Sequence, residues 1–177
     1  MARGFFLYAT AWERRTHLDW HSSMRLYLVH HADAIGPDID PSRPLSAQGR
    51  ATAEALARRA AERGLKPDVI WHSGKLRAKQ TAEFFWRTCH PLAEFSATRG
   101  LQPDDPPRWI ADTLIGESRQ IMLVGHMPHL ALLLRLLVSG KPEASAPDFP
   151  LHGIVELQSK DERAEGKRTW VEVWRDL

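Results

Sequence analysis

The chain has 177 residues, 43% hydrophobic and 26% charged, so it can fold as one domain without metals or disulfides. Its formal net charge of +2 is too small to predict nucleic-acid binding, and its single cysteine, Cys89, excludes an internal disulfide and a thiolate metal cage. The longest apolar run, 130–138, contains Arg135 and is far shorter than the roughly 18 residues of a membrane span. We therefore expect a cytoplasmic monomer that binds neither nucleic acid nor membrane.

The first 23 residues differ in pattern from the rest of the chain. They hold two tryptophans and two histidines without the periodicity of a helix or a strand. A short apolar run at 5–12 is closed at once by charged residues, which argues against a signal peptide. We predict that residues 1–23 are a disordered extension or the product of a misassigned start codon, and that the folded domain spans 24–177.

Apolar patterning predicts the elements of this domain in chain order. We expect strands at 25–29, 68–72 and 120–124, helices at 46–63, 75–87, 108–114 and 128–139, and a closing hairpin of strands at 152–158 and 168–174. The stretch 91–107 holds four prolines and is predicted to be a loop. This order predicts an α/β three-layer sandwich with a mostly parallel central sheet flanked by helices.

Histidines mark the ends of the three central strands. His30 and His31 follow the first strand, His72 the second and His126 the third, while Arg77 lies in the first turn of a predicted helix. Ligands of such sheets bind beyond the carboxyl ends of the strands. A neutral imidazole can attack phosphorus without a metal, and arginine and helix N-termini suit an anionic phosphoryl group. The pattern therefore predicts phosphoryl transfer.

Four segments carry a resemblance to a known family. They are 26–32 (L-Y-L-V-H-H-A), 43–49 (R-P-L-S-A-Q-G), 73–83 (S-G-K-L-R-A-K-Q-T-A-E) and 124–128 (V-G-H-M-P). In order and spacing they resemble the strand–R-H-G, R-P-L-[ST]-x-x-G, S-x-x-x-R-A-x-Q-T-A-E and V-G-H-x-P blocks of the histidine phosphatase superfamily. The resemblance extends over 24–175 and is strongest to the short SixA-type phosphohistidine phosphatases. It implies a phosphoglycerate mutase-like fold.

The resemblance also implies a set of roles. His31 would be the nucleophile that carries the phosphoryl group, and Arg77 and His126 would bind that group. The implied enzyme is a metal-independent phosphatase that needs no cofactor. Larger family members use a carboxylate as general acid between the third and fourth blocks, and Asp104 and Asp105 lie in that interval.

Two departures from the family pattern leave alternatives open. His30 stands where the family has a phosphate-binding arginine, and Ala32 replaces a glycine and is expected to crowd the phosphate loop. If His30 acts as a cation, it must be protonated while His31 is neutral, and activity should peak below neutrality. The alternatives are a weakened or inactive phosphate- or phosphoprotein-binding module and a small-molecule phosphomonoesterase.

The preferred substrate is phosphohistidine on a phosphotransfer protein, because no large insertion after the first strand is available to cap a small metabolite. A small phosphorylated substrate remains open, and phosphate transfer as in the mutases is less favoured. His72, His129 and His152 are expected to be structural, with His152 in the pocket as an alternative. A metal site is disfavoured because adjacent histidines on a strand, such as His30 and His31, point to opposite faces.

Overall fold

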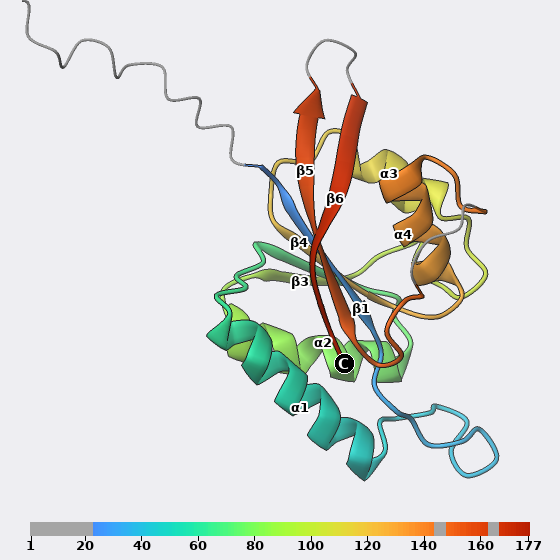
Figure 1. Cartoon of the computed structure of the whole chain (residues 1–177). Helices are drawn as coiled ribbons and strands as arrows, with labels where there is room; N and C mark the ends of the chain where they lie inside the picture. Colours follow the sequence, from blue (N-terminus) through green and yellow to red (C-terminus); the bar gives the residue numbers. More distant parts are fainter. Residues whose placement is uncertain (1–22, 144–147, 163–166) are drawn as a thin grey trace, which may run out of the picture.

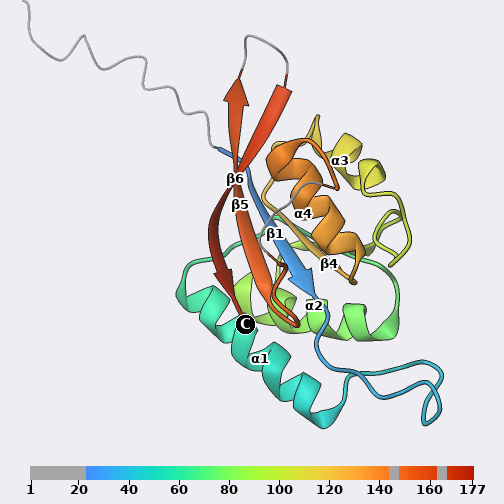
Figure 2. The same cartoon turned by 45° about the vertical axis from the view of Figure 1, so that its right-hand side comes forward.

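The computed structural model describes residues 23–143, 148–162 and 167–177, which form one mixed sheet with helices on both faces (Figures 1 and 2). The strands are β1 (Arg25–His30), β2 (Val69–His72), β3 (Glu94–Ala97), β4 (Ile121–Gly125), β5 (Ile154–Glu162) and β6 (Lys167–Asp176). The helices are α1 (Ala47–Glu62), α2 (Leu76–Cys89), α3 (Arg108–Leu114) and α4 (His129–Ser139). The predicted extension at 1–23 falls almost entirely outside the described residues.

The strand order is β3-β2-β4-β1-β5-β6. The four strands β3, β2, β4 and β1 pair in parallel, whereas β5 pairs antiparallel with β1 and β6 antiparallel with β5. The predicted α/β sandwich and its closing hairpin are therefore confirmed. In the part of the chain that the structure describes, no helix is long and apolar enough to cross a membrane.

The loop predicted at 91–107 is wrong in part, because it contains β3. This strand has only four residues and pairs on one side only, with β2, where Phe95 lies opposite Ile70. A short edge strand that is only half-buried needs no run of apolar residues, so its sequence pattern is weak. All four prolines of the stretch lie outside the strand.

Alternate residues of β1 face two separate cores. Leu26 and Leu28 pack into the core that α3 and α4 cover, while Tyr27 and Val29 pack into the core that α1 and α2 cover. Burial on both faces explains why the strand is a continuous apolar run rather than an alternating one.

A close contact fixes the loop that follows β1. The Ser46 hydroxyl caps α1 by accepting a hydrogen bond from Gly49 N–H at 2.9 Å, and it donates to the Asp33 carboxylate at 2.5 Å. Ser46 N–H also donates to the Asp33 carbonyl oxygen at 3.1 Å. A Cβ at Gly49 would lie 2.0 Å from that oxygen, so only glycine fits here. The R-P-L-S-x-x-G block therefore anchors the segment that carries His31.

Gly49→Ala should lower the free energy of unfolding by about 2–3 kcal/mol, because two backbone segments must separate to admit the methyl group. Urea denaturation measures this change. Gly116→Ala is the matched control, since a Cβ there meets nothing within 4 Å. Equal stability of the two variants would contradict the proposed close packing.

Candidate active site

The loops after β1, β2 and β4 are tied together at one end of the sheet. His30 pairs with Gly125, and His72 pairs with Val124. The residue that follows each of these two strands continues the pairing with β4. His31 N–H donates to Gly125 O at 3.1 Å, and Ser73 N–H donates to Val124 O at 3.3 Å. The three histidine-bearing strand ends thus meet, as the sequence predicted.

His31 presents one ring nitrogen to the site. Its Nδ1 lies 2.8 Å from the carbonyl oxygen of Ala32, which can only accept, so Nδ1 carries the ring proton. Its Nε2 is then the lone-pair nitrogen and accepts from Arg77 Nε–H at 3.1 Å. Burial, aided by the charge of Arg77, lowers the pKa of His31 from 6.5 to about 4. His31 is therefore a neutral imidazole at physiological pH, with Nε2 free to act as a nucleophile.

The start of α2 and the Thr81 hydroxyl hold Arg77 beside His31. It is the second residue of α2 and is largely buried. The Thr81 hydroxyl donates to Arg77 O at 2.8 Å and accepts from Ala32 N–H at 3.1 Å, which joins the first turn of α2 to the segment after His31. Burial lowers the pKa of Arg77, with a smaller contribution from the charge of nearby Arg43, but a guanidinium stays cationic. Thr81 was not singled out from the sequence, although it lies in the third motif block.

His126 offers a second polar atom to the same place. Its ring lies 4.9 Å from the His31 ring and is 1% exposed. Its Nε2 is 2.7 Å from the Ser73 hydroxyl, which also accepts from Lys75 N–H at 3.4 Å. The hydroxyl can accept a second hydrogen bond or donate its own proton to Nε2, and in the second case the ring proton of His126 lies on Nδ1. Nδ1 is buried and has no hydrogen-bond partner among the described residues.

The structure favours a neutral His30 over a cationic one. The residue is 5% exposed, and burial, followed by the neighbouring histidines, lowers its pKa from 6.5 to about 3. The expectation that His30 and His31 point apart is wrong, since their ring centroids are 4.6 Å apart. The alternation rule fails because β1 ends at His30 and His31 already lies beyond the strand.

Ala32 does not crowd the phosphate loop as expected. It is 1% exposed and packs in a small apolar cluster with Leu45 and Ala53. Its methyl group is thus directed into the protein, while its backbone N–H and carbonyl bond to Thr81 and His31. The departure from glycine is accommodated.

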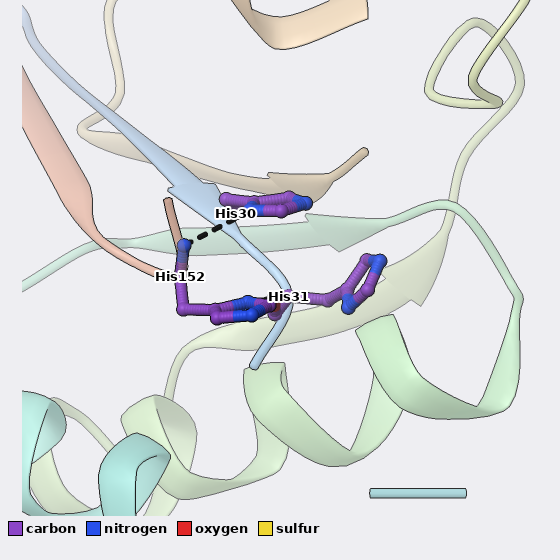
Figure 3. Close-up of side chains that lie close together, drawn as sticks. All are labelled: His30, His31 and His152. Atoms are coloured by element: carbon purple, nitrogen blue, oxygen red, sulfur yellow. Dashed lines mark hydrogen bonds between the residues drawn. The ribbon is translucent and has the colours of Figure 1, made fainter. Parts of the chain in front are cut away.

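His152 lies beside His30 and His31, where the sequence leaves open a place in the pocket as the alternative to a structural role. Its ring stacks on the His30 ring at 5.1 Å with an interplanar angle of 3° (Figure 3). Its Nδ1 is 2.6 Å from His31 O, and its backbone has a φ of 57°, a conformation uncommon outside glycine. The sequence carried no signal for this contact beyond the position of His152 ahead of a strand.

The two carboxylate candidates lie on the loop before α3. Asp104 is exposed, and Asp105 Oδ2 accepts from the N–H groups of Gly100 and Gln102 at 3.1 and 2.9 Å. Gln102 in turn donates to Ser73 O. These bonds give Asp105 a part in bracing the loop against Ser73, and a role of either aspartate as general acid stays a prediction.

Three further residues have no contact with the nucleophile. His72 Nδ1 accepts from Gly74 N–H at 3.1 Å and its ring packs on Phe95, a structural role as expected. Burial raises the pKa of Cys89 to about 11, so its thiol is protonated and is no nucleophile. His129 is fully buried at the start of α4, and burial lowers its pKa.

Comparisons with known proteins agree with this geometry. Residues 26–102 match the model of the histidine phosphatase superfamily (branch 1). The match contains the first three motif blocks and agrees with the resemblance found in the sequence. No curated protein sequence matches the chain.

Solved structures share the fold. The protein histidine phosphatase SixA in complex with tungstate superposes with a TM-score of 0.72 at 19% identity, over 86% of this chain and 96% of that one. A protein from Agrobacterium tumefaciens assigned as the phosphohistidine phosphatase SixA gives 0.69 at 25% identity, over 88% and 98% of the two chains. Phosphoglycerate mutase from Plasmodium falciparum gives 0.63 at 17% identity, over 86% and 89%. The predicted phosphoglycerate mutase-like fold is confirmed, and family and neighbours together support phosphatase activity.

The neutral histidines of the site should make the fold sensitive to acid. Their pKa values are lowered from 6.5 to about 3, about 4 and about 2 for His30, His31 and His126. Between these values and 6.5 the unfolded chain binds more protons than the folded one, so the free energy of unfolding falls as the pH falls through that window. Urea denaturation from about pH 7 to about pH 4 measures the slope. His126→Gln should make the slope shallower, and an unchanged slope would contradict the assignment.

Proposed function

We propose that the protein is a metal-independent phosphatase that hydrolyses phosphohistidine through a phosphoryl intermediate on His31. The observation that carries the proposal is the geometry of the His31 ring. Nδ1–H is fixed on Ala32 O, and the Nε2 lone pair faces the Arg77 guanidinium at 3.1 Å. A phosphoryl group that replaces this internal contact would lie between a nucleophile and a cation.

The reaction has two steps. In the first, His31 Nε2 forms a bond to phosphorus as the bond to the substrate nitrogen breaks. The substrate ring, which is protonated on its other nitrogen, takes the electron pair of the broken bond and leaves as neutral imidazole. In the second, water attacks phosphorus, the Nε2–phosphorus bond breaks, and inorganic phosphate is released. The proton on Nδ1 of His31 stays in place throughout, so the His31 side chain is again a neutral imidazole once phosphate has been released. Ala32 O stabilises the positive charge on the phosphorylated ring.

Three donors are available for the phosphoryl oxygens in this proposal. Arg77 supplies a guanidinium, His126 supplies Nδ1–H in the tautomer that accepts from the Ser73 hydroxyl, and His30 supplies a neutral ring N–H. None of these steps uses a metal. The substrate would be phosphohistidine on a phosphotransfer protein, because an imidazole leaving group departs without a strong acid, and Asp104 and Asp105 are the only acid candidates we identified from the sequence.

The first test follows the phosphoryl group. Wild-type protein treated with phosphoramidate should gain an acid-labile phosphoryl group in intact-protein mass spectrometry and should release inorganic phosphate. His31→Ala should gain none, with a rate lowered by about 10³-fold or more. His90→Gln, which alters a histidine bonded to Pro67 O, is the control and should behave as wild type. Turnover retained in His31→Ala would refute the nucleophile.

The second test is the pH profile. Since the pKa of His31 is lowered to about 4, kcat/KM should stay level from neutrality down to about pH 5 and fall as His31 is protonated below that. Stopped assays of phosphate release in constant-ionic-strength buffers measure it. A narrow maximum just below neutrality would instead restore the cationic role of His30.

The alternative of a phosphate-binding module without turnover rests on the histidine at position 30. It predicts tungstate or phosphate binding with no adduct on His31 and no phosphate release. The two readings are therefore separated by the same mass measurement combined with a binding titration.

A further inference from the structure

His152 makes contacts with His30 and His31 that the proposed reaction does not itself require. The backbone N–H of His152 donates to His30 Nδ1 at 3.0 Å, although the two residues are 122 positions apart. The two rings are stacked, and His152 Nδ1 lies 2.6 Å from His31 O (Figure 3). His152 makes these contacts with a φ of 57°, a left-handed conformation that is strained for a residue other than glycine.

The first contact decides which nitrogen of His30 carries its proton. A backbone N–H can only donate, so the His30 Nδ1 that it faces must be the lone-pair nitrogen. The neutral ring then has its proton on Nε2. Figure 3 shows His30 and His31 extending to the same side, with the far end of the His30 ring toward His31. His30 Nε2–H is thereby a donor beside the nucleophile.

The second contact holds the arrangement in place. The carbonyl of His31 can only accept, so His152 Nδ1 donates to it and the ring of His152 is fixed relative to the nucleophile. The stacked ring covers one face of His30, and His30 N–H donates to Gly153 O at 3.0 Å. The segment 152–153 thus sets both the position of His30 and the backbone that carries His31.

We propose that His152 is a positioning residue, whose backbone N–H and stacked ring keep the neutral His30 in its Nε2–H form as a phosphoryl-oxygen donor. The inference rests on the proposed function, since it assigns a positioning role to a residue of the same site. It explains how a histidine serves at a position where the family has an arginine.

The same three rings could instead be taken for a metal site. His30, His31 and His152 each offer a ring nitrogen, and these nitrogens lie within 4.8 Å of one another. A metal ion needs a lone pair from each ring. The Nδ1 lone pair of His30 is occupied by the His152 N–H, and its Nε2 carries the proton. The trio is therefore arranged for an anion rather than for a cation.

The test uses variants of His152 in the full chain. His152→Gly removes the ring and relieves the positive φ, so the fold should lose no stability. His152→Phe keeps a stacked ring but not the bond to His31 O. Leu151→Ala is the control, since Leu151 is 65% exposed beside the segment.

Two readouts need no turnover. Long-range proton–nitrogen correlation spectra should find the His30 proton on Nε2 in the wild type and also in His152→Gly, because that variant keeps the backbone N–H that faces His30 Nδ1. Isothermal titration with tungstate should give about tenfold weaker binding for His152→Gly, a smaller loss for His152→Phe and none for Leu151→Ala. Phosphoryl transfer from phosphoramidate should lose at least as much in kcat as tungstate binding loses, with KM changed less.

Several results would overturn the inference. They are a His30 proton on Nδ1 in the wild type, wild-type tungstate affinity in His152→Gly, or a His152→Phe variant no better than His152→Gly. Stoichiometric zinc binding that shifts the rings of His30, His31 and His152 would also overturn it. Because proton position and tungstate affinity are measured without catalysis, an absence of turnover in the wild type would refute the proposed function and leave this test standing.

Discussion

The parallel pairing of β1, β4 and β2 is the constraint on which the site depends. Parallel strands end at the same edge of a sheet, and the bonds from His31 to Gly125 and from Ser73 to Val124 extend that pairing one residue past the strands. The nucleophile, the serine that bonds to His126, and His126 itself are consequently brought together by backbone contacts. Their side chains also bond to one another or to neighbouring groups, and His126 Nδ1 is the buried polar atom among them that has no partner in the described part of the chain.

This placement has an electrostatic consequence. The site is buried enough to keep His30, His31 and His126 neutral, and the only charge that directly contacts the nucleophile in the described structure is that of Arg77. Neutral N–H groups of fixed direction stabilise developing charge well in a site of low dielectric, because they need no reorganisation during the reaction. A neutral His30 can therefore stabilise a phosphoryl oxygen at the position where the family has an arginine, provided that its proton is held on Nε2.

Sequence reasoning found what depends on local pattern. The apolar runs predicted the buried strands and helices, and the motif resemblance singled out His31 and His126 at strand ends and Arg77 at the start of α2. It failed where tertiary contacts decide: β3 exists because β2 offers an open edge, and His152 reaches His30 through a turn at positive φ that no periodicity reveals. Burial also cannot be predicted from the identity of a single histidine, so the sequence left the charge of His30 open, and its 5% exposure favours the neutral ring.

The kind of bond to be broken bears on whether such a site is sufficient. The alcohol of a phosphate ester leaves as an alkoxide, which needs a proton from a well-placed acid. The reaction also needs strong stabilisation of the phosphoryl oxygens. The Asp105 carboxylate accepts hydrogen bonds from Gly100 and Gln102, and Asp104 is exposed. Neither aspartate is bonded to the nucleophile or to Arg77. A phosphorus–nitrogen bond to imidazole makes smaller demands on both counts, because the leaving group is a stable neutral base. A site with one direct guanidinium, neutral histidine donors and no engaged acid therefore supports the proposal of phosphohistidine, rather than a phosphate ester, as the substrate.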